Sequence, residues 1–162
     1  MKRMLIVIAC LAAGLAAQGK ADPGFDKMRT LVGQWEGKNS SGNVARVSYA
    51  LTAGDSVLME TIAPANDSTM VSMYHLDGDR LMMTHYCGAG NQPRMRAGQV
   101  GADPREITFT FQDATNLPNP DAGHMVGLTL TFQSKDRITQ VWTWREKGRA
   151  DMNEKFELVR KK

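Results

Sequence analysis

The chain has 162 residues, 42% of them hydrophobic and 23% charged, and its formal net charge at pH 7 is +3. The surplus of positive charge lies in Lys2, Arg3 and Lys20, because the 17 acidic residues, all beyond residue 21, are matched by the remaining lysines and arginines. The positive net charge is therefore no argument for nucleic-acid binding, and we expect no nucleic-acid partner.

The first 21 residues have the pattern of a secretory signal peptide. Two basic residues precede an uncharged apolar run over residues 4–17, and small and polar residues follow up to position 21. The run is shorter than the roughly 20 residues of a membrane-spanning helix, and no later segment is apolar enough to span a membrane. We therefore expect a cleaved leader over residues 1–21, a periplasmic or secreted location, and a single domain over residues 22–162.

The two cysteines have different expected fates. Cys10 falls within the leader, so the mature chain would keep only Cys87 and could form no disulfide within itself. In an alternative interpretation Cys10 is a lipid-modified N-terminus, because residues 7–10 resemble a lipobox. The apolar run continues past Cys10, which favours the ordinary leader.

A short helix is predicted at the start of the domain. Asp22 and Pro23 suit a helix cap and a first turn. Apolar residues then recur at helical spacing up to Val32, and Gly33 ends the run.

Beyond residue 33 the hydrophobic pattern changes to a period of two. Residues 107–111, 126–132 and 138–144 alternate apolar and polar side chains, as strands with one buried face do. Turn signals separate about ten such runs, and no helical segment lies between them, so the sheet must be antiparallel. We predict an all-β fold: a closed antiparallel up-and-down β-barrel of about ten strands, with the short N-terminal helix capping one end. A two-sheet sandwich is the alternative.

Several stretches resemble a known family. The Gly33-Gln34-Trp35 sequence at the first predicted strand looks like the G-x-W motif of lipocalin-like (calycin-like) barrels. The segment MYHLDGDRLMMTHYC over residues 73–87, GNQPRM over residues 90–95, and the pairs His124-Met125 and Trp142-Thr143 resemble exported bacterial lipocalin-like proteins of uncharacterised function. The resemblance covers most of residues 24–160, and that family is itself similar in architecture to nitrobindin-type haem-binding barrels. It implies a barrel of about ten strands with an internal cavity, and no particular activity.

Strand pairing predicts which histidine faces the interior. A two-residue turn at Asp77-Gly78 would place Ser72 opposite Met83, with side chains alternating between the two faces. His85 and His75 then point to opposite sides of the wall, and we place His85 inside because Tyr74, Leu76 and Leu81 accompany it. His85 is either a structural histidine or a polar contact for a ligand. Cys87, on the same face, is either a small buried hydrophobe or a reactive thiol.

Glu60 is the second residue that the register singles out. A turn at Gly54-Asp55 pairs Glu60 with Tyr49 and puts a carboxylate on an otherwise apolar face. If that face is the inner one, Tyr49 could donate to the carboxylate, and Arg94 or Arg96 could neutralise it. If it is the outer face, Glu60 is solvated, and both interpretations stay open at this point.

These patterns favour a protein that binds a small lipophilic molecule in the barrel, and not an enzyme on balance. Haem is an alternative, in which His85 or His124 would serve as the ligand because residues 155–160 hold no histidine. Two further alternatives are a soft-metal site made of Met70, Met83, His85 and Cys87, and a small enzyme using His85, Cys87 and Glu60. The sequence identifies neither a cofactor nor an oligomeric state. The predicted ligand-binding residues are Trp35, Tyr49, Glu60, His85, Cys87, Arg94, His124, Trp142 and Trp144.

Overall fold

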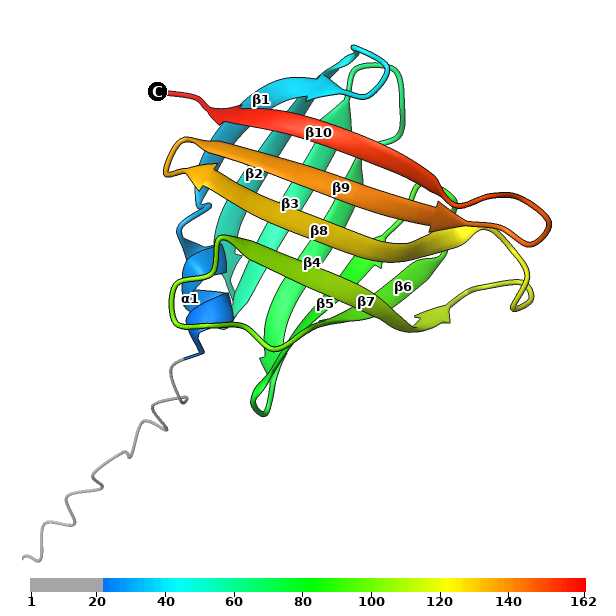
Figure 1. Ribbon diagram of the computed structural model, residues 1–162, viewed down its shortest axis with the longest axis horizontal. Coiled ribbons are helices and arrows are strands. Elements are labelled where there is room, and N and C mark those ends of the chain that lie inside the picture. Colours follow the sequence, from blue (N-terminus) through cyan, green and yellow to red (C-terminus); the bar gives the residue numbers. More distant parts are fainter. Residues whose placement is uncertain (1–21) are drawn as a thin grey trace, which may run out of the picture.

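The computed structural model describes residues 22–162, which form a closed antiparallel barrel of ten strands (Figure 1). Each strand pairs with its neighbours in the sequence, and the first strand pairs with the last to close the wall. The predicted closed up-and-down barrel is confirmed, and the sandwich alternative is wrong. The predicted leader and Cys10 lie outside the described residues. The strands are β1 (Gly33–Asn39), β2 (Val44–Thr52), β3 (Val57–Pro64), β4 (Met70–Asp77), β5 (Arg80–Tyr86), β6 (Gln92–Ala97), β7 (Glu106–Thr115), β8 (His124–Ser134), β9 (Arg137–Arg145) and β10 (Met152–Arg160).

The predicted helix is present as α1 (Pro23–Arg29) and closes one end of the barrel. The Asp22 carboxylate accepts a hydrogen bond from the backbone N–H of Phe25 at 2.7 Å, which satisfies one of the free donors at the helix start. Phe25 and Met28 are buried against the core. No helix within residues 22–162 is long and apolar enough to cross a membrane.

The end of the chain is tied to the segment that follows α1. The Arg160 guanidinium donates to the carbonyl oxygens of Val32 and Thr30, both at 2.7 Å, and lies 4.3 Å from the centre of the Trp35 ring. The Trp35 indole N–H donates to the Leu31 carbonyl oxygen at 2.8 Å. The contacts join α1, β1 and β10 at the helix-covered end.

Glycine is required where the barrel closes. A Cβ atom on Gly37 in β1 would lie 1.7 Å from the backbone carbonyl oxygen of Glu157 in β10, which no side chain could tolerate. The two backbones therefore approach closely at the seam only because residue 37 has no side chain.

The hairpin between β2 and β3 has the predicted register, in which Tyr49 lies opposite Glu60. Ala53, Gly54 and Asp55 in its turn have positive φ angles of 52°, 62° and 63°. Both Tyr49 and Glu60 are buried in the interior, so the face that carries Glu60 is the inner one.

The hairpin between β4 and β5 differs from its predicted register by two residues. Its turn residues are Gly78 and Asp79, and Asp77 pairs with Arg80. Gly78 has a φ of +63°, which glycine adopts freely at the first position of a tight hairpin turn. Ser72 consequently lies opposite His85 instead of Met83. Because a slip of two residues preserves the face, His85 still points inward, as predicted.

Candidate functional site

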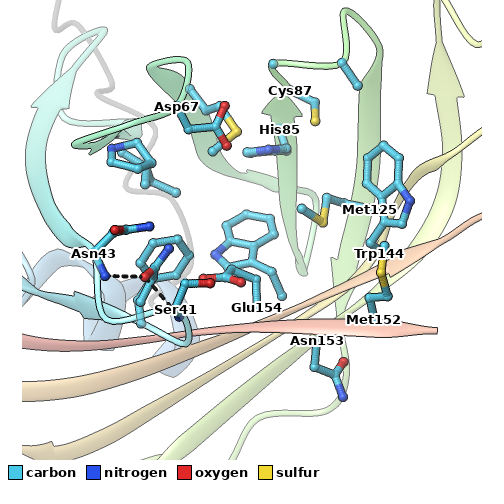
Figure 2. A pocket seen from close by; sticks show the side chains of 18 of the residues that line it. Ser41, Asn43, Asp67, His85, Cys87, Met125, Trp144, Met152, Asn153 and Glu154 are labelled. Atoms are coloured by element: carbon cyan, nitrogen blue, oxygen red, sulfur yellow. Dashed lines mark hydrogen bonds between the residues drawn. The ribbon is translucent and has the colours of Figure 1, made fainter.

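A cavity of about 500 Å³ opens at the end of the barrel opposite α1 (Figure 2). This volume lies within the range of small-molecule sites in proteins. Its rim comes from the loops that join β1 to β2, β3 to β4 and β5 to β6, together with the start of β10. Its apolar wall consists of Ile62, Met70, Met125, Trp142, Trp144 and Phe156.

His85 lines the cavity and has one ring nitrogen without a partner. The side chain is 1% exposed, Nδ1 lies 3.0 Å from the Ser72 hydroxyl oxygen, and the ring packs on Trp142 with centroids 4.5 Å apart. Its Nε2 atom is buried and makes no hydrogen bond. Burial lowers the pKa of His85 to about 4, so the imidazole is neutral at pH 7. A neutral imidazole has one donor and one acceptor nitrogen, and the role that Ser72 does not use falls to Nε2.

Glu60 lies at the centre of a buried polar cluster. Its carboxylate is fully buried and accepts hydrogen bonds from the Tyr49 hydroxyl at 2.6 Å and the Tyr74 hydroxyl at 2.8 Å, and a further bond from the Gln140 amide. Burial raises the pKa of Glu60, while the hydrogen bonds from Tyr49, Tyr74, Gln140 and Ser72 act in the opposite direction. Burial is also the main cause that raises the pKa values of Tyr49 and Tyr74, so both hydroxyls remain donors.

The cluster continues from Glu60 to the cavity wall. The Gln140 amide oxygen accepts a hydrogen bond from the Trp142 indole N–H at 3.0 Å. On the other side, Ser72 bonds to His85. The rings of His85 and Trp142, which line the cavity and pack against each other at a tilt, are therefore both bonded to one polar network beneath them.

Gln140 is the member of this network that our sequence reasoning missed. It is fully buried, and it follows Ile138 and precedes Trp142 at intervals of two residues on β9. That alternation placed Gln140 on the inner face, and a polar residue among buried apolar ones was the available signal.

We had predicted that Arg94 or Arg96 could neutralise an inward-facing Glu60, but neither arginine pairs with it. The Arg94 guanidinium donates two hydrogen bonds to the Asp113 carboxylate, both at 2.5 Å, and the pair is half-exposed on the outer surface. The physical reason is strand alternation: Met95 is fully buried, so the arginines on either side of it belong to the other face.

Two other predicted ligand-binding residues lie away from the cavity. Trp35 packs beneath α1 at the closed end, and His124 packs its ring on Phe111 with centroids 4.7 Å apart. The His124 Nδ1 atom lies 2.7 Å from the Ala122 carbonyl oxygen. Neither lines the cavity, whereas His85, Cys87, Trp142 and Trp144 do. Tyr49 and Glu60 lie beneath the lining, within the polar cluster.

An irregularity in β8 decides which residue at the start of this strand enters the cavity wall. The register between β8 and β9 shifts between Met125 and Gly127, with Met125 opposite Trp144. Met125 therefore lines the cavity, whereas Val126, the first apolar residue of the alternating run predicted over residues 126–132, does not. Nearby, a Cβ atom on Gly123 would lie 2.2 Å from the Trp144 ring, so this glycine gives Trp144 its place at the rim.

The sulfur-containing residues form no evident catalytic or metal site. Cys87 is half-buried, and burial raises the pKa of its thiol. None of the hydrogen bonds within residues 22–162 joins Cys87 to His85, which is the contact an imidazole-activated thiol requires. No three histidine, cysteine, aspartate or glutamate residues of the described chain gather as metal ligands would. Met83 is fully buried and is not part of the cavity lining.

The described residues thus define an antiparallel ten-strand β-barrel with a cavity of ligand size. No family model matches the chain, and no curated protein matches it. Among solved structures, it is similar to Rv2717c from M. tuberculosis, with a TM-score of 0.59 and 14% sequence identity over 88% of this chain and 100% of that one. At this identity the likeness establishes the fold alone, and the predicted relationship to lipocalin-like and nitrobindin-type barrels stays a prediction.

Proposed function

We propose that this protein binds a small lipophilic molecule in the cavity at the open end of the barrel, with a polar group of the ligand meeting His85. The observation that carries the proposal is the buried, unpartnered Nε2 atom of His85, a residue that lines the cavity beside its apolar wall. Buried polar atoms in native proteins nearly always have a partner, and a ligand would supply this one.

The surrounding structure is suited to such a role. His85 bonds to Ser72 and packs against Trp142 in a tilted arrangement, so two contacts orient its ring before a ligand arrives. Preorganisation of this kind reduces the entropy cost of binding. Three methionines and three aromatic residues are among the side chains that line the cavity, and such side chains adapt well to an apolar guest.

The residues fit haem less well. His85 has a free ring nitrogen that could ligate iron, but none of the described residues lining the cavity is a lysine or arginine that could pair with the haem propionates. We therefore derive no function through haem. Cu(I) binding by Met70, His85 and Cys87 has no specific contact in its favour.

The proposal is tested with Nile red, an uncharged lipophilic dye, whose fluorescence rises in an apolar site. The native protein should bind the dye, and Met125→Trp, which fills the cavity from its wall, should bind it at least about tenfold more weakly. Met73→Trp adds the same bulk to a half-buried position outside the lining and serves as the control. Equal binding by all three proteins, or none by the native protein, would overturn the proposal.

We also propose that the protein is exported. This rests on the pattern of residues 1–21 alone. Mass spectrometry of protein from its own host should find a chain that begins near residue 22, in the periplasm or the medium. A full-length chain in the cytoplasm would contradict it.

A further inference from the structure

Within residues 22–162 the cavity lining contains acidic side chains but no lysine or arginine, and the proposed function does not account for this difference. Two carboxylates line it near its mouth, Asp67 in the loop between β3 and β4 and Glu154 in β10, and Figure 2 shows them at its edge. Among the described residues that line the cavity, none is a lysine or an arginine. The described side chains that line the cavity therefore bring two negative charges and no lysine or arginine charge to its mouth.

Glu154 occupies an inward-facing position of its strand. It precedes the buried residues Phe156 and Leu158 at intervals of two residues, and it lies opposite Trp142 in the β9–β10 ladder. One oxygen of its carboxylate accepts a hydrogen bond from the Ser40 backbone N–H at 3.2 Å. Within residues 22–162 it forms no salt bridge, unlike Glu157, which pairs with Lys155. A half-buried acid beside aromatic rings, without a cation from the chain, suits an organic cation.

Asp67 acts on the same space from the opposite side of the mouth. Its carboxylate accepts a hydrogen bond from the Ser68 backbone N–H at 2.6 Å and forms no salt bridge with any described residue. Its charge reaches the cavity wall, because after burial it is one of the causes that raise the pKa of the Cys87 thiol. His85 gives no compensating positive charge at neutral pH.

We propose that the ligand is a lipophilic cation. Its positive group lies at the mouth between Asp67 and Glu154, its apolar body packs against Trp142 and Trp144, and a second polar group at its inner end meets His85. This inference rests on the proposed function and adds the sign of the ligand's charge. The buried, unpartnered Nε2 atom of His85 is the independent sign that the cavity takes a ligand at all. A fatty acid would bring its carboxylate into a mouth of the same charge, so it should bind more weakly than a cation of the same chain length.

Three probes with the same decyl chain test the proposal by displacement of Nile red, all below the concentration at which they form micelles. Decylammonium should bind the native protein about tenfold or more tightly than decanoate at low salt, with decanol between them, because each carboxylate attracts one probe and repels the other. The preference should shrink as salt is raised, since the mouth is open to solvent and screening shortens the range of charge interactions to about 10 Å at 0.1 M.

Matched variants locate the effect. The double variant Asp67→Asn with Glu154→Gln keeps the shapes of both side chains and should reduce the preference for decylammonium to within about twofold. Glu157→Gln removes a charge from the same strand at an exposed position outside the cavity lining and should leave the preference unchanged. Decanoate binding as tightly as decylammonium, or a preference that survives in the double variant, would overturn the inference while the proposed function stands. Failure of Nile red to bind would overturn both.

Discussion

The buried cluster around Glu60 provides the sharpest test of how this barrel is held together. Replacing Tyr74 with phenylalanine removes one hydroxyl and leaves the rest of the side chain in place. That hydroxyl donates to Glu60 at 2.8 Å, and both residues are fully buried, so bulk solvent does not reach the carboxyl group to replace the lost hydrogen bond.

The expected cost follows from the size of a buried hydrogen bond to a carboxyl group. A bond of this kind, with the penalty for leaving its acceptor short of a donor, contributes about 2 kcal/mol to the free energy of unfolding. For a domain of this length, a loss of that size lowers the melting temperature by about 4–8 °C. Urea denaturation at pH 7, followed by tryptophan fluorescence, measures it directly.

Tyr86→Phe is the matched control, because it removes the same atom from an exposed tyrosine on the neighbouring strand β5. It should change the free energy of unfolding by no more than about 0.5 kcal/mol. If both variants cost the same, the Tyr74 hydroxyl has no special place in the interior, and the buried cluster described above is wrong. A cycle that combines Tyr74→Phe with Glu60→Gln would then show no coupling.

Three further predictions concern protonation, closure and access. Burial raises the pKa of Glu60 above 4.5, so the stability that its protonated form contributes is full below about pH 4.5 and is lost as the pH rises through the folded-state pKa. In urea titrations from about pH 4 to pH 8, the free energy of unfolding of Glu60→Gln should therefore rise relative to that of the native protein. Parallel pH profiles for the two proteins would refute this. Gly37→Ala should cost about 3 kcal/mol or more, or prevent folding, while Gly101→Ala, whose added Cβ atom meets nothing within 4 Å, should stay within about 0.5 kcal/mol in the same assay. Cys87 should react with iodoacetamide at pH 7 more slowly than it does in the urea-unfolded protein, because burial raises the pKa of its thiol; equal rates measured by mass spectrometry would count against its place in the cavity wall.

Local pattern was enough to predict the barrel and, in most strands, which residues share a face, although it left open whether the face of Glu60 is the inner one and missed the irregularity in β8. A strand has a period of two, so the alternation of apolar residues assigns faces without any knowledge of the neighbouring strands. The Tyr49–Glu60 pair followed from one short turn, and His85 pointed inward even though its hairpin register slipped by two residues. Closure followed from the number of strands and the absence of crossover helices.

Contacts between distant segments were decided only by the tertiary structure. Gln140 reaches Glu60 and Tyr49 across 80 and 91 residues of sequence, and no local pattern states which inward-facing residues will meet across a barrel. For an inward-facing Glu60 we named Tyr49 as a possible donor and Arg94 or Arg96 as a possible neutralising partner, since an acid is costly to bury unless it is paired. The fold instead satisfies this carboxylate with neutral hydroxyl and amide donors.

The open cavity also emerged only in three dimensions. Whether inward-facing side chains fill a barrel depends on their combined shapes, on the irregularity that turns Met125 inward, and on which end α1 covers. Alternation in the sequence determines which side of the wall a residue faces. The cavity beside His85, with Glu154 and Asp67 at its mouth, exists because the ten strands close into a barrel whose inward-facing side chains leave space at the open end.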